Sequence, residues 1–463
     1  MVVDVDFYRA HEGLSVTVSG KFSCVPYLIL QQISIGVYMP WYLDVSDFKY
    51  GYGPTALALF GPTGNRMLFT CTANCSDPAH HHAQSPLSAV DSKSPKSAKP
   101  KTAQALKGKV AARASVAAPT KKVVKDGSGK FKVVDIHCHY LNPIVNQKTA
   151  HLNAAQYDPT VIFANQLTRE TNVRQMRDRT PKLIGIEERI RDMDRMGVDI
   201  QAVCPAPYHY FYFTEPDLGA SLAREVNEGI ASLVASHPDR FVGLGSVPLQ
   251  NAELAVRELE YAVKKLGLRG VEINTNVNGM NLTDPRLGLE KFFAKANELG
   301  IVVFMHPLGF TQADRLTNHY FNNVIGNPMD TTIAVSHLIF DGVAARHPKI
   351  KFIAAHGGGY IAHYWARMDH AWKARPDCRT VIKRKPSSYL EKFYFDSITF
   401  DPRMLRQLID RYGADHVLLG TDYPYDMGEE DPRGLIAAVK KLPVQQRRQI
   451  EGLNAMRLLK IKA

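Results

Sequence analysis

From Phe131 to the C-terminus, short β-branched runs alternate with stretches of helical periodicity. This alternation is typical of repeated βαβ units, whose strands pair in parallel. Eight strand candidates recur there: Val133–His137, Gln201–Pro205, Phe241–Val247, Gly270–Asn274, Ile301–His306, Lys351–His356, Phe393–Ser397 and Val417–Thr421. Eight strands, each followed by helical sequence over about 330 residues, predict an α/β fold, a (β/α)8 barrel of the TIM type. An open doubly wound sheet is the alternative, but no GxGxxG turn follows the first strand candidate.

The helical stretches lie between consecutive strand candidates, as the connections of a barrel require. They are predicted at Ile184–Met196, Leu218–Ala235, Ala252–Leu266, Pro285–Leu299, Asp330–Arg346, Ile361–Lys373 and Pro402–Arg411. Two more, Gly434–Lys441 and Gln445–Leu459, follow the last strand candidate. The predicted barrel domain therefore spans residues 131–463.

The net charge of +12 does not belong to this barrel region. Between Asp91 and Lys132, twelve lysines and arginines face two aspartates in a Lys/Ala/Ser/Pro-rich stretch. Such a composition is typical of a solvated linker, so we predict a basic low-complexity linker at residues 86–130 and no specific nucleic-acid partner. Residues 1–85 are an N-terminal extension of unknown role, which we expect to be largely disordered.

The chain is predicted to be a cytoplasmic protein without a membrane span. The most apolar segment, Val25–Tyr42, is interrupted by glutamines, a serine and a proline. The first residues are acidic and lack the basic region of a secretory signal. Six cysteines are scattered without a CxxC pair, which indicates reduced thiols.

Polar side chains recur where the strand candidates end. The first strand ends in an HxH motif, and alternation along the strand points His137 and His139 the same way. The fifth strand ends at His306, the sixth at His356, and Asp422 follows the eighth. Each signal alone is weak, but all four lie at the end of the barrel that carries active sites. Imidazole and carboxylate ligands suit Zn²⁺ or a similar divalent ion in an open catalytic site.

The same residues carry a resemblance to a known family. From about residue 133 to 460 the chain resembles the amidohydrolase superfamily of the amidohydrolase-2 type, in the branch of aminocarboxymuconate-semialdehyde decarboxylase. The motifs are Val134-Asp135-Ile136-His137-Cys138-His139, Met193-Asp194-Arg195-Met196-Gly197-Val198-Asp199, Val247-Pro248-Leu249-Gln250, His306-Pro307, His356-Gly357-Gly358-Gly359, Arg367-Met368-Asp369-His370-Ala371-Trp372 and Gly420-Thr421-Asp422-Tyr423-Pro424. Residues before 131 have no counterpart in that family.

The resemblance implies one divalent metal ion bound by four side chains: His137, His139, His306 and Asp422. Zinc is expected, with manganese, iron or cobalt as alternatives. His356 would act as acid and base beside a metal-bound water, whose lowered pKa makes hydroxide available near pH 7, with Asp422 as its catalytic partner. The alternative for His356 is a fifth ligand or a buried core histidine. The fourth strand has no lysine, which favours one metal, although Glu272 leaves a second metal open.

Arginines would hold the acidic groups of the substrate. Arg367, eleven residues after His356, matches an arginine that this branch uses on the substrate carboxylate across a dimer interface. The alternative for Arg367 is a surface or interface ion pair. A second such arginine is expected near Arg174 or Arg177. By the same resemblance, the protein would be a homodimer that acts on a small-molecule carboxylic acid.

The predicted function is therefore metal-dependent, non-oxidative decarboxylation of an aromatic or ring-opened, muconate-type carboxylic acid. After His306 the chain continues Pro307-Leu308-Gly309-Phe310, where the named branch carries a tryptophan, so the substrate stays open. The alternative enzyme is a metal-dependent hydrolase or hydratase. It would use the same hydroxide as a nucleophile on an amide, lactone or alkene. A metal-binding scaffold without turnover is disfavoured because His356 and Asp422 are both intact.

Overall fold

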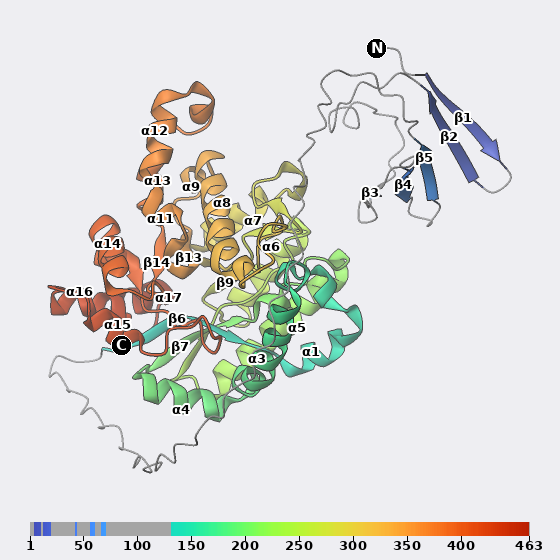
Figure 1. Ribbon diagram of the computed structural model, residues 1–463. Coiled ribbons are helices and arrows are strands. Elements are labelled where there is room, and N and C mark those ends of the chain that lie inside the picture. The colour runs from blue at the N-terminus through green and yellow to red at the C-terminus, as the bar shows by residue number, and fades with distance from the viewer. Residues whose placement is uncertain are drawn as a thin grey trace, which may run out of the picture. The chain divides into compact units, whose positions relative to one another are not determined.

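The computed structural model describes residues 131–462 and, nearer the N-terminus, the backbone of five short strands (Figure 1). The chain divides into two compact units, Met1–Ala118 and Pro119–Ala463. In the first unit, two antiparallel sheets are formed by β1 (Asp4–Ala10) with β2 (Gly13–Ser19), and by β3 (Tyr42–Leu43), β4 (Ala56–Phe60) and β5 (Arg66–Thr70). The predicted linker at residues 86–130 and the predicted disorder of the rest of the extension lie outside the described residues.

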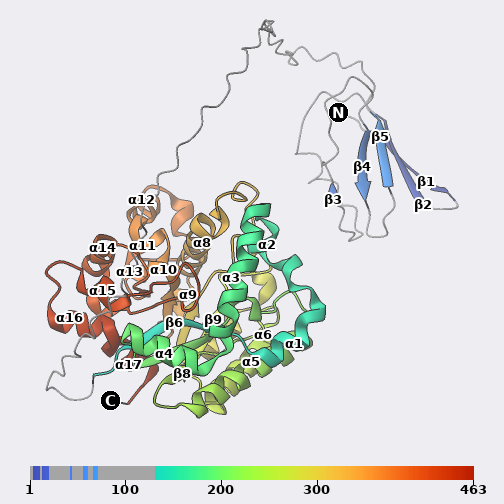
Figure 2. The ribbon, with the colours of Figure 1, turned by 60° about the horizontal axis from the view of Figure 1, so that its bottom comes forward.

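The second unit is a closed barrel of eight parallel strands (Figures 1 and 2). The strands are β6 (Val134–Tyr140), β7 (Ile200–Pro205), β8 (Phe241–Gly243), β9 (Gly270–Ile273), β12 (Val302–Met305), β13 (Lys351–Ala354), β14 (Tyr394–Asp396) and β15 (Val417–Leu418). They follow one another around the barrel in sequence order. A bridge between Gly245 and Val271 joins β8 to β9, and Ile136 N donates to Leu419 O over 2.9 Å beside β6 and β15. The predicted (β/α)8 barrel is confirmed.

Helices cover the outside of the barrel because each has one apolar face. They include α4 (Ile186–Met196), α5 (Pro216–Ser236), α6 (Ala252–Lys264), α7 (Glu290–Leu299), α8 (Asn327–Phe340) and α14 (Pro402–Tyr412). In α14, the side chains of Leu405, Leu408, Ile409 and Tyr412 are buried at helical spacing. That helix begins where the Asp401 side chain accepts a hydrogen bond from Arg403 N.

Three predicted helices are divided, two of them by a glycine in the left-handed region. Gly288, at φ 62°, separates the turn η4 (Pro285–Leu287) from α7 within the stretch predicted as one helix. Gly342, at φ 82°, separates α8 from α9 (Val343–Arg346) in the same way. The stretch predicted at 361–373 forms α11 (Ile361–Tyr364) and α12 (Ala366–Ala374). A glycine at positive φ ends a helix at little steric cost, which hydrophobic periodicity does not reveal.

The sequence analysis did not predict the insertion between β6 and β7. This insertion contains α1 (Pro143–Thr149), α2 (Pro159–Ile162) and α3 (Gln166–Ile184). Of the nineteen residues of α3, only Leu183 is buried. A helix without an apolar stripe gives no periodic signal, so α3 could not be recognised by pattern. Among the described residues, no helix combines the length and the apolarity that a membrane crossing requires.

Candidate metal centre and active site

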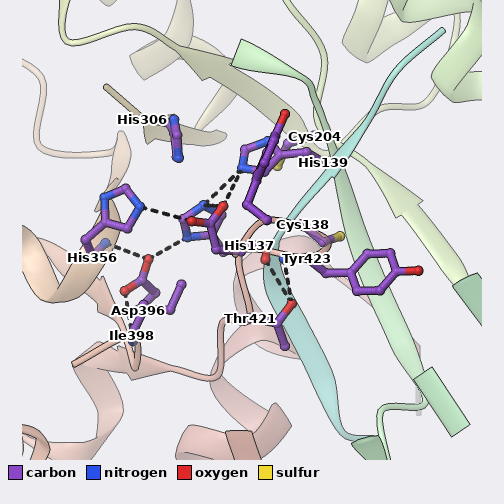
Figure 3. Close-up of polar contacts among 12 residues, drawn as sticks. His137, Cys138, His139, Cys204, His306, His356, Asp396, Ile398, Thr421 and Tyr423 are labelled. Atoms are coloured by element: carbon purple, nitrogen blue, oxygen red, sulfur yellow. Dashed lines mark hydrogen bonds and ion pairs between the residues drawn. The ribbon is translucent and has the colours of Figure 1, made fainter. Parts of the chain in front are cut away.

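The metal-ligand candidates meet at the carboxyl ends of the strands (Figure 3). His137 and His139 lie on β6, whose register against β7 shifts by one residue between Asp135 and Cys138. Such a bulge changes the direction in which a strand presents its side chains. His306 follows β12 and Asp422 lies beyond β15. The structure therefore brings together side chains that the sequence places almost 300 positions apart.

Four of these side chains offer ligand atoms within 4.8 Å of one another: His137, His306, His356 and Asp422. His139 belongs to the same cluster, because its Nε2 lies 3.2 Å from His137 Nε2 and 3.1 Å from Asp422 Oδ1. His356 Nε2 lies 3.5 Å from Asp422 Oδ2. The Asp422 carboxylate thus sits at the centre of four imidazoles, and residues 131–462 hold this one group with metal-ligand geometry.

Hydrogen bonds orient the two histidines of β6 toward the cluster. His137 Nδ1 lies 2.8 Å from Asp396 Oδ2, and His139 Nδ1 lies 3.0 Å from the carbonyl oxygen of Pro205. Both acceptors require Nδ1 to carry the proton, which leaves the Nε2 lone pairs directed at the cluster. This arrangement is the usual one for histidines that bind a metal.

His306 shows that the cluster suits a cation. Both its ring nitrogens are buried and lack a hydrogen-bond partner among the described residues. Burial, reinforced by His139 and His137, holds the pKa of His306 well below its usual range, so the ring is neutral. A buried polar atom without a partner is costly, and a bound metal ion would satisfy it.

The charges of the cluster also fit a divalent ion. Burial alone would raise the pKa of Asp422, but His137 and His139 outweigh it and lower that pKa well below the usual value. Burial opposes a charge on His137, yet Asp422 and Asp396 raise the pKa of His137 to about 10. A second proton, on His137 Nε2, thus balances the two carboxylates, and a divalent cation bound at that nitrogen would replace it. One ionised carboxylate with neutral imidazoles is a donor set for zinc, manganese, iron or cobalt.

Asp396 is a functional residue that the sequence analysis missed. Besides facing His137, its carboxylate accepts hydrogen bonds of 2.8 Å from the backbone N–H groups of His356 and Gly357. It therefore positions one metal-ligand candidate and the turn that carries His356, the candidate acid and base (Figure 3). Asp396 ends β14, the seventh strand of the barrel. A carboxylate at the end of the seventh strand candidate was the signal that could have identified it.

The turn after β13 presents His356 to the site. His356 has φ 55°, and Gly357, Gly358 and Gly359 follow at φ 61°, 81° and 62°. A Cβ on Gly358 would come within 2.5 Å of the Phe395 ring. The glycines therefore pack closely against the barrel. The His356 side chain is 16 % exposed, compared with 7 % for Asp422 and 0 % for His137. Of these three groups, His356 is the most open to a substrate.

The buried carboxylate of Asp135 also stabilises the cluster through hydrogen bonds. Asp135 accepts hydrogen bonds from His137 N at 3.0 Å, from Thr421 Oγ1 at 2.6 Å and from Gln201 Nε2 at 3.1 Å. Burial, opposed by the Thr421 hydroxyl and the His137 N–H, raises the pKa of Asp135 to about 6. This network ties the first strand to the loop that carries Asp422.

The predicted substrate-binding arginines do not join the cluster within one chain. Arg367 is exposed on α12 and has no hydrogen bond or ion pair with any described residue. Arg174 and Arg177 are exposed on α3, where they face Thr171 and Asp178 of their own helix. Arg179 of that helix is the arginine near the site. Its side chain is 14 % exposed, and its Nε donates to Pro424 O over 3.0 Å, in the loop after Asp422.

Comparison with known proteins agrees with this geometry. The sequence matches the amidohydrolase family over residues 134–461. The chain belongs to the amidohydrolase family. It is 38% identical over 272 residues to the 2-amino-3-carboxymuconate-6-semialdehyde decarboxylase of Dictyostelium discoideum, covering 58% of this chain and 75% of that protein. The resemblance seen in the sequence is thereby confirmed.

Solved structures of two decarboxylases share the barrel. The 5-carboxyvanillate decarboxylase of Sphingomonas paucimobilis matches with a TM-score of 0.64 at 24% identity, over 72% of this chain and 100% of that one. A dihydroxybenzoic acid decarboxylase from Polaromonas sp., solved with bound manganese and 2-nitroresorcinol, matches with a TM-score of 0.61 at 22% identity, over 72% and 98%. These two likenesses establish the fold. The decarboxylase relatives confirm the prediction of a carboxy-lyase of the amidohydrolase superfamily.

Proposed function

We propose that the barrel removes CO₂ non-oxidatively from an aromatic or ring-opened, muconate-type carboxylic acid, with one divalent metal ion held by four side chains: His137, His139, His306 and Asp422. The observation that carries this proposal is the buried, partnerless His306 ring facing an ionised Asp422 in a barrel of the amidohydrolase family. When bound, the metal supplies Lewis-acid polarisation and lowers the pKa of a coordinated water.

The residues of the chain provide the remaining chemistry. Loss of CO₂ breaks a carbon–carbon bond and leaves its electron pair on the substrate carbon, which must then take up a proton. His356 is placed to deliver that proton, because it is partly exposed and lies beside Asp422. Asp396 holds the His356 backbone in place through its N–H group.

Arginines hold the substrate carboxylate in this proposal. Arg179 is the candidate from the same chain, since it borders the loop of Asp422 and is largely buried. Arg367 is exposed and has no hydrogen bond or ion pair with the described part of its own chain, so it would serve the site of a second copy in a homodimer. Arg174 and Arg177 would act from α3 only after rearrangement, because both face solvent.

Zinc remains the proposed physiological metal, with manganese, iron and cobalt able to use the same donors. We also propose a cytoplasmic location. Three cysteines among the described residues, Cys138, Cys204 and Cys378, are free thiols. Reduced thiols are usual in proteins of the cytosol. The extension and linker, residues 1–130, are proposed to contribute nothing to the chemistry.

The test is CO₂ release by metal-loaded protein from aminocarboxymuconate semialdehyde, hydroxybenzoates and phthalates. His356→Ala should abolish release, whereas His370→Ala, an exposed histidine on α12, should leave it unchanged. Release that depends on both metal and His356 supports the decarboxylase. Hydrolysis or hydration of an amide, lactone or alkene without CO₂ release would replace it with the rival activity on the same barrel.

A further inference from the structure

We propose that a cavity next to the metal centre, but separate from it, is a second binding site that takes a small aromatic amine in its ammonium form, with Asp158 as the counter-ion. The cavity has a volume of about 280 Å³. It lies between the insertion after β6 and the loops that follow β7, β9 and β12. This volume is close to the lower limit of about 300 Å³ for ligand pockets, so it suits one ring with a short substituent.

Tyrosines of the wall separate the cavity from the metal centre. The hydroxyl of Tyr208 lies 2.6 Å from that of Tyr425, whose ring centroid is 5.3 Å from that of His139. Tyr210 turns its hydroxyl away to donate to Glu272 Oε1 over 2.8 Å. All side chains of the metal cluster are described, and none of them lines the cavity. A molecule in the cavity would therefore not contact a bound metal ion.

The wall consists largely of aromatic rings. Tyr157 and Phe213 stack with their centroids 4.3 Å apart and an interplanar angle of 9°, and Tyr210 stacks on Tyr212 at 5.5 Å and 22°. Aromatic side chains bind a flat ring by stacking and edge contacts, and the negative faces of their rings attract a cation. The wall therefore favours a ligand that is both aromatic and positively charged.

Asp158 gives the cavity its charge. It is the one carboxylate among the lining residues, and no lysine, arginine or histidine of the described chain lines the cavity. Asp158 Oδ1 accepts hydrogen bonds from Thr160 N at 2.8 Å and Thr160 Oγ1 at 2.7 Å. Asp158 Oδ2 has no hydrogen bond or ion pair with any described residue. This free carboxylate oxygen is where an ammonium group would bind.

The surroundings of Asp158 lack a cation that could compensate its charge. Burial raises the pKa of Asp158, and the hydrogen bonds from Thr160 oppose that effect. The nearby Arg179 contacts Pro424 O and lies 3.9 Å from Asp426, and it does not line the cavity. A buried carboxylate without a counter-ion is costly, so a bound ammonium would stabilise it.

Further polar atoms can satisfy the remaining N–H bonds of an ammonium group, which carries three donors. Tyr212 is 4 % exposed, and its buried hydroxyl has no hydrogen-bond partner among the described residues. Asn146 and Asn278 add amide groups to the wall. A carboxylate in the same place would face Asp158 without a counter-ion, so the cavity should reject the acids on which the proposed decarboxylase acts.

The test uses three ligands that carry the same ring on one methylene group: benzylamine, benzyl alcohol and phenylacetate. Full-length protein, metal-loaded and metal-free, is titrated with each ligand at pH 7 by calorimetry, where benzylamine is an ammonium ion. We expect benzylamine to bind at least about 10-fold more tightly than benzyl alcohol, and phenylacetate to bind more weakly than either. The Kd of benzylamine should be the same with and without metal.

Two variants separate the contribution of the charge from that of the ring. Asp158→Asn should weaken benzylamine binding at least about 10-fold and leave benzyl alcohol unchanged, and asparagine preserves the cap of α2. Tyr157→Ala, at a side chain that is 50 % exposed, should weaken both ligands alike. Asp178→Asn, an exposed aspartate on α3, is the matched control and should change neither.

Equal binding of the amine and the alcohol by the wild type would overturn the assignment, whether or not the variants fold. Binding that requires the metal would place the amine at the metal centre instead, and binding that is unchanged in Asp158→Asn would also refute the site. The titrations do not depend on CO₂ release, so this site and the proposed decarboxylation can each fail alone.

Discussion

At the scale of single residues, the metal centre depends on groups that do not touch the metal. His137 and Asp396 are 259 positions apart, yet their 2.8 Å contact fixes which nitrogen of His137 faces the cluster. The same carboxylate holds the backbone of His356. A single side chain therefore sets the orientation of a ligand and of the proposed acid, which makes it more sensitive to substitution than its position outside the cluster suggests.

Asp396→Asn should lower metal affinity and activity by about 10- to 100-fold while the barrel stays folded. Asparagine keeps the size of the side chain but loses the charge that favours the Nδ1–H tautomer of His137. Metal titration and CO₂ release measure the effect. Asp377→Asn, an exposed aspartate paired with Arg375, is the control. Wild-type metal affinity in Asp396→Asn would show that the contact does not orient the ligand.

The buried His209 should lower the stability of the folded protein in acid. It is 2 % exposed, stacks on Phe211 at 5.3 Å, and neither ring nitrogen has a partner among the described residues. Burial lowers its pKa from 6.5 to about 3. The unfolded chain therefore binds a proton below pH 6.5 while the folded chain does not, and the free energy of unfolding falls as the pH drops from 6.5 toward 3.

Between pH 7 and pH 5, His209 should cost about 2 kcal/mol of stability, at about 1.4 kcal/mol per pH unit below 6.5. His209→Phe keeps the ring and removes the titration, so its urea midpoint should fall less on acidification than that of the wild type. His370→Phe, at an exposed position, should keep the wild-type pH response. An identical response in His209→Phe would mean that His209 is protonated in the folded protein.

At the scale of elements, short irregular segments place the catalytic groups more than the regular helices do. The one-residue register shift of β6 against β7 falls between Asp135 and Cys138, so it includes His137. The turn after β13 holds four successive residues at positive φ. Both features lie at strand ends, where departures from ideal geometry re-aim side chains.

Gly358→Ala tests that turn. It adds a Cβ at φ 81° and within 2.5 Å of Phe395, so it should destabilise the protein by roughly 2–4 kcal/mol through backbone strain and overpacking. Gly267→Ala has a similar φ of 73° but nothing within 4 Å of the new Cβ. It should cost only about 1 kcal/mol. Urea unfolding of both variants measures the difference, and equal losses would show that the contact with Phe395 does not matter.

At the scale of the whole molecule, closure of the barrel assembles the site. Hydrogen bonds from Asp422 N to His137 O at 2.8 Å and from His139 N to Tyr423 O at 2.9 Å join the last strand to the first. All the ligand candidates lie in the unit Pro119–Ala463. The side chains of the cluster, as far as the structure describes the chain, all come from residues 137–422.

Removal of residues 1–118 should therefore leave a folded barrel with wild-type metal content and kcat/KM. The cut falls between the two compact units and keeps Lys132, whose backbone packs against Gly452, and Phe131, whose ring lies beside the same glycine. Circular dichroism, bound metal and CO₂ release of the shortened chain measure the outcome. A drop in activity with the metal retained would assign a catalytic role to the extension.

The sequence by itself determined the barrel, the order of its strands and the ligand candidates. Strands buried in a parallel barrel must be β-branched and apolar, and their carboxyl ends meet at one end, so His137, His139, His306, His356 and Asp422 could be placed together. Helices with an apolar face, such as α14, could also be predicted from the sequence. The sequence after His306 did not determine the shape of the substrate pocket, because loops carry no hydrophobic periodicity.

Only the tertiary structure decided which polar residues support the site. Three side chains form hydrogen bonds with residues far away in the sequence: Asp396, Asp135 and Arg179. Such contacts depend on three-dimensional distance rather than on spacing in the sequence. The polar helix α3 could not be predicted because it has no apolar stripe. A cavity lined by Tyr157, Tyr208 and Asn274 exists because the insertion after β6 lies over the loops that follow β7, β9 and β12. Hydrophobic patterns in the sequence indicate which residues are buried. Polar contacts between distant residues form only when the barrel has folded and closed.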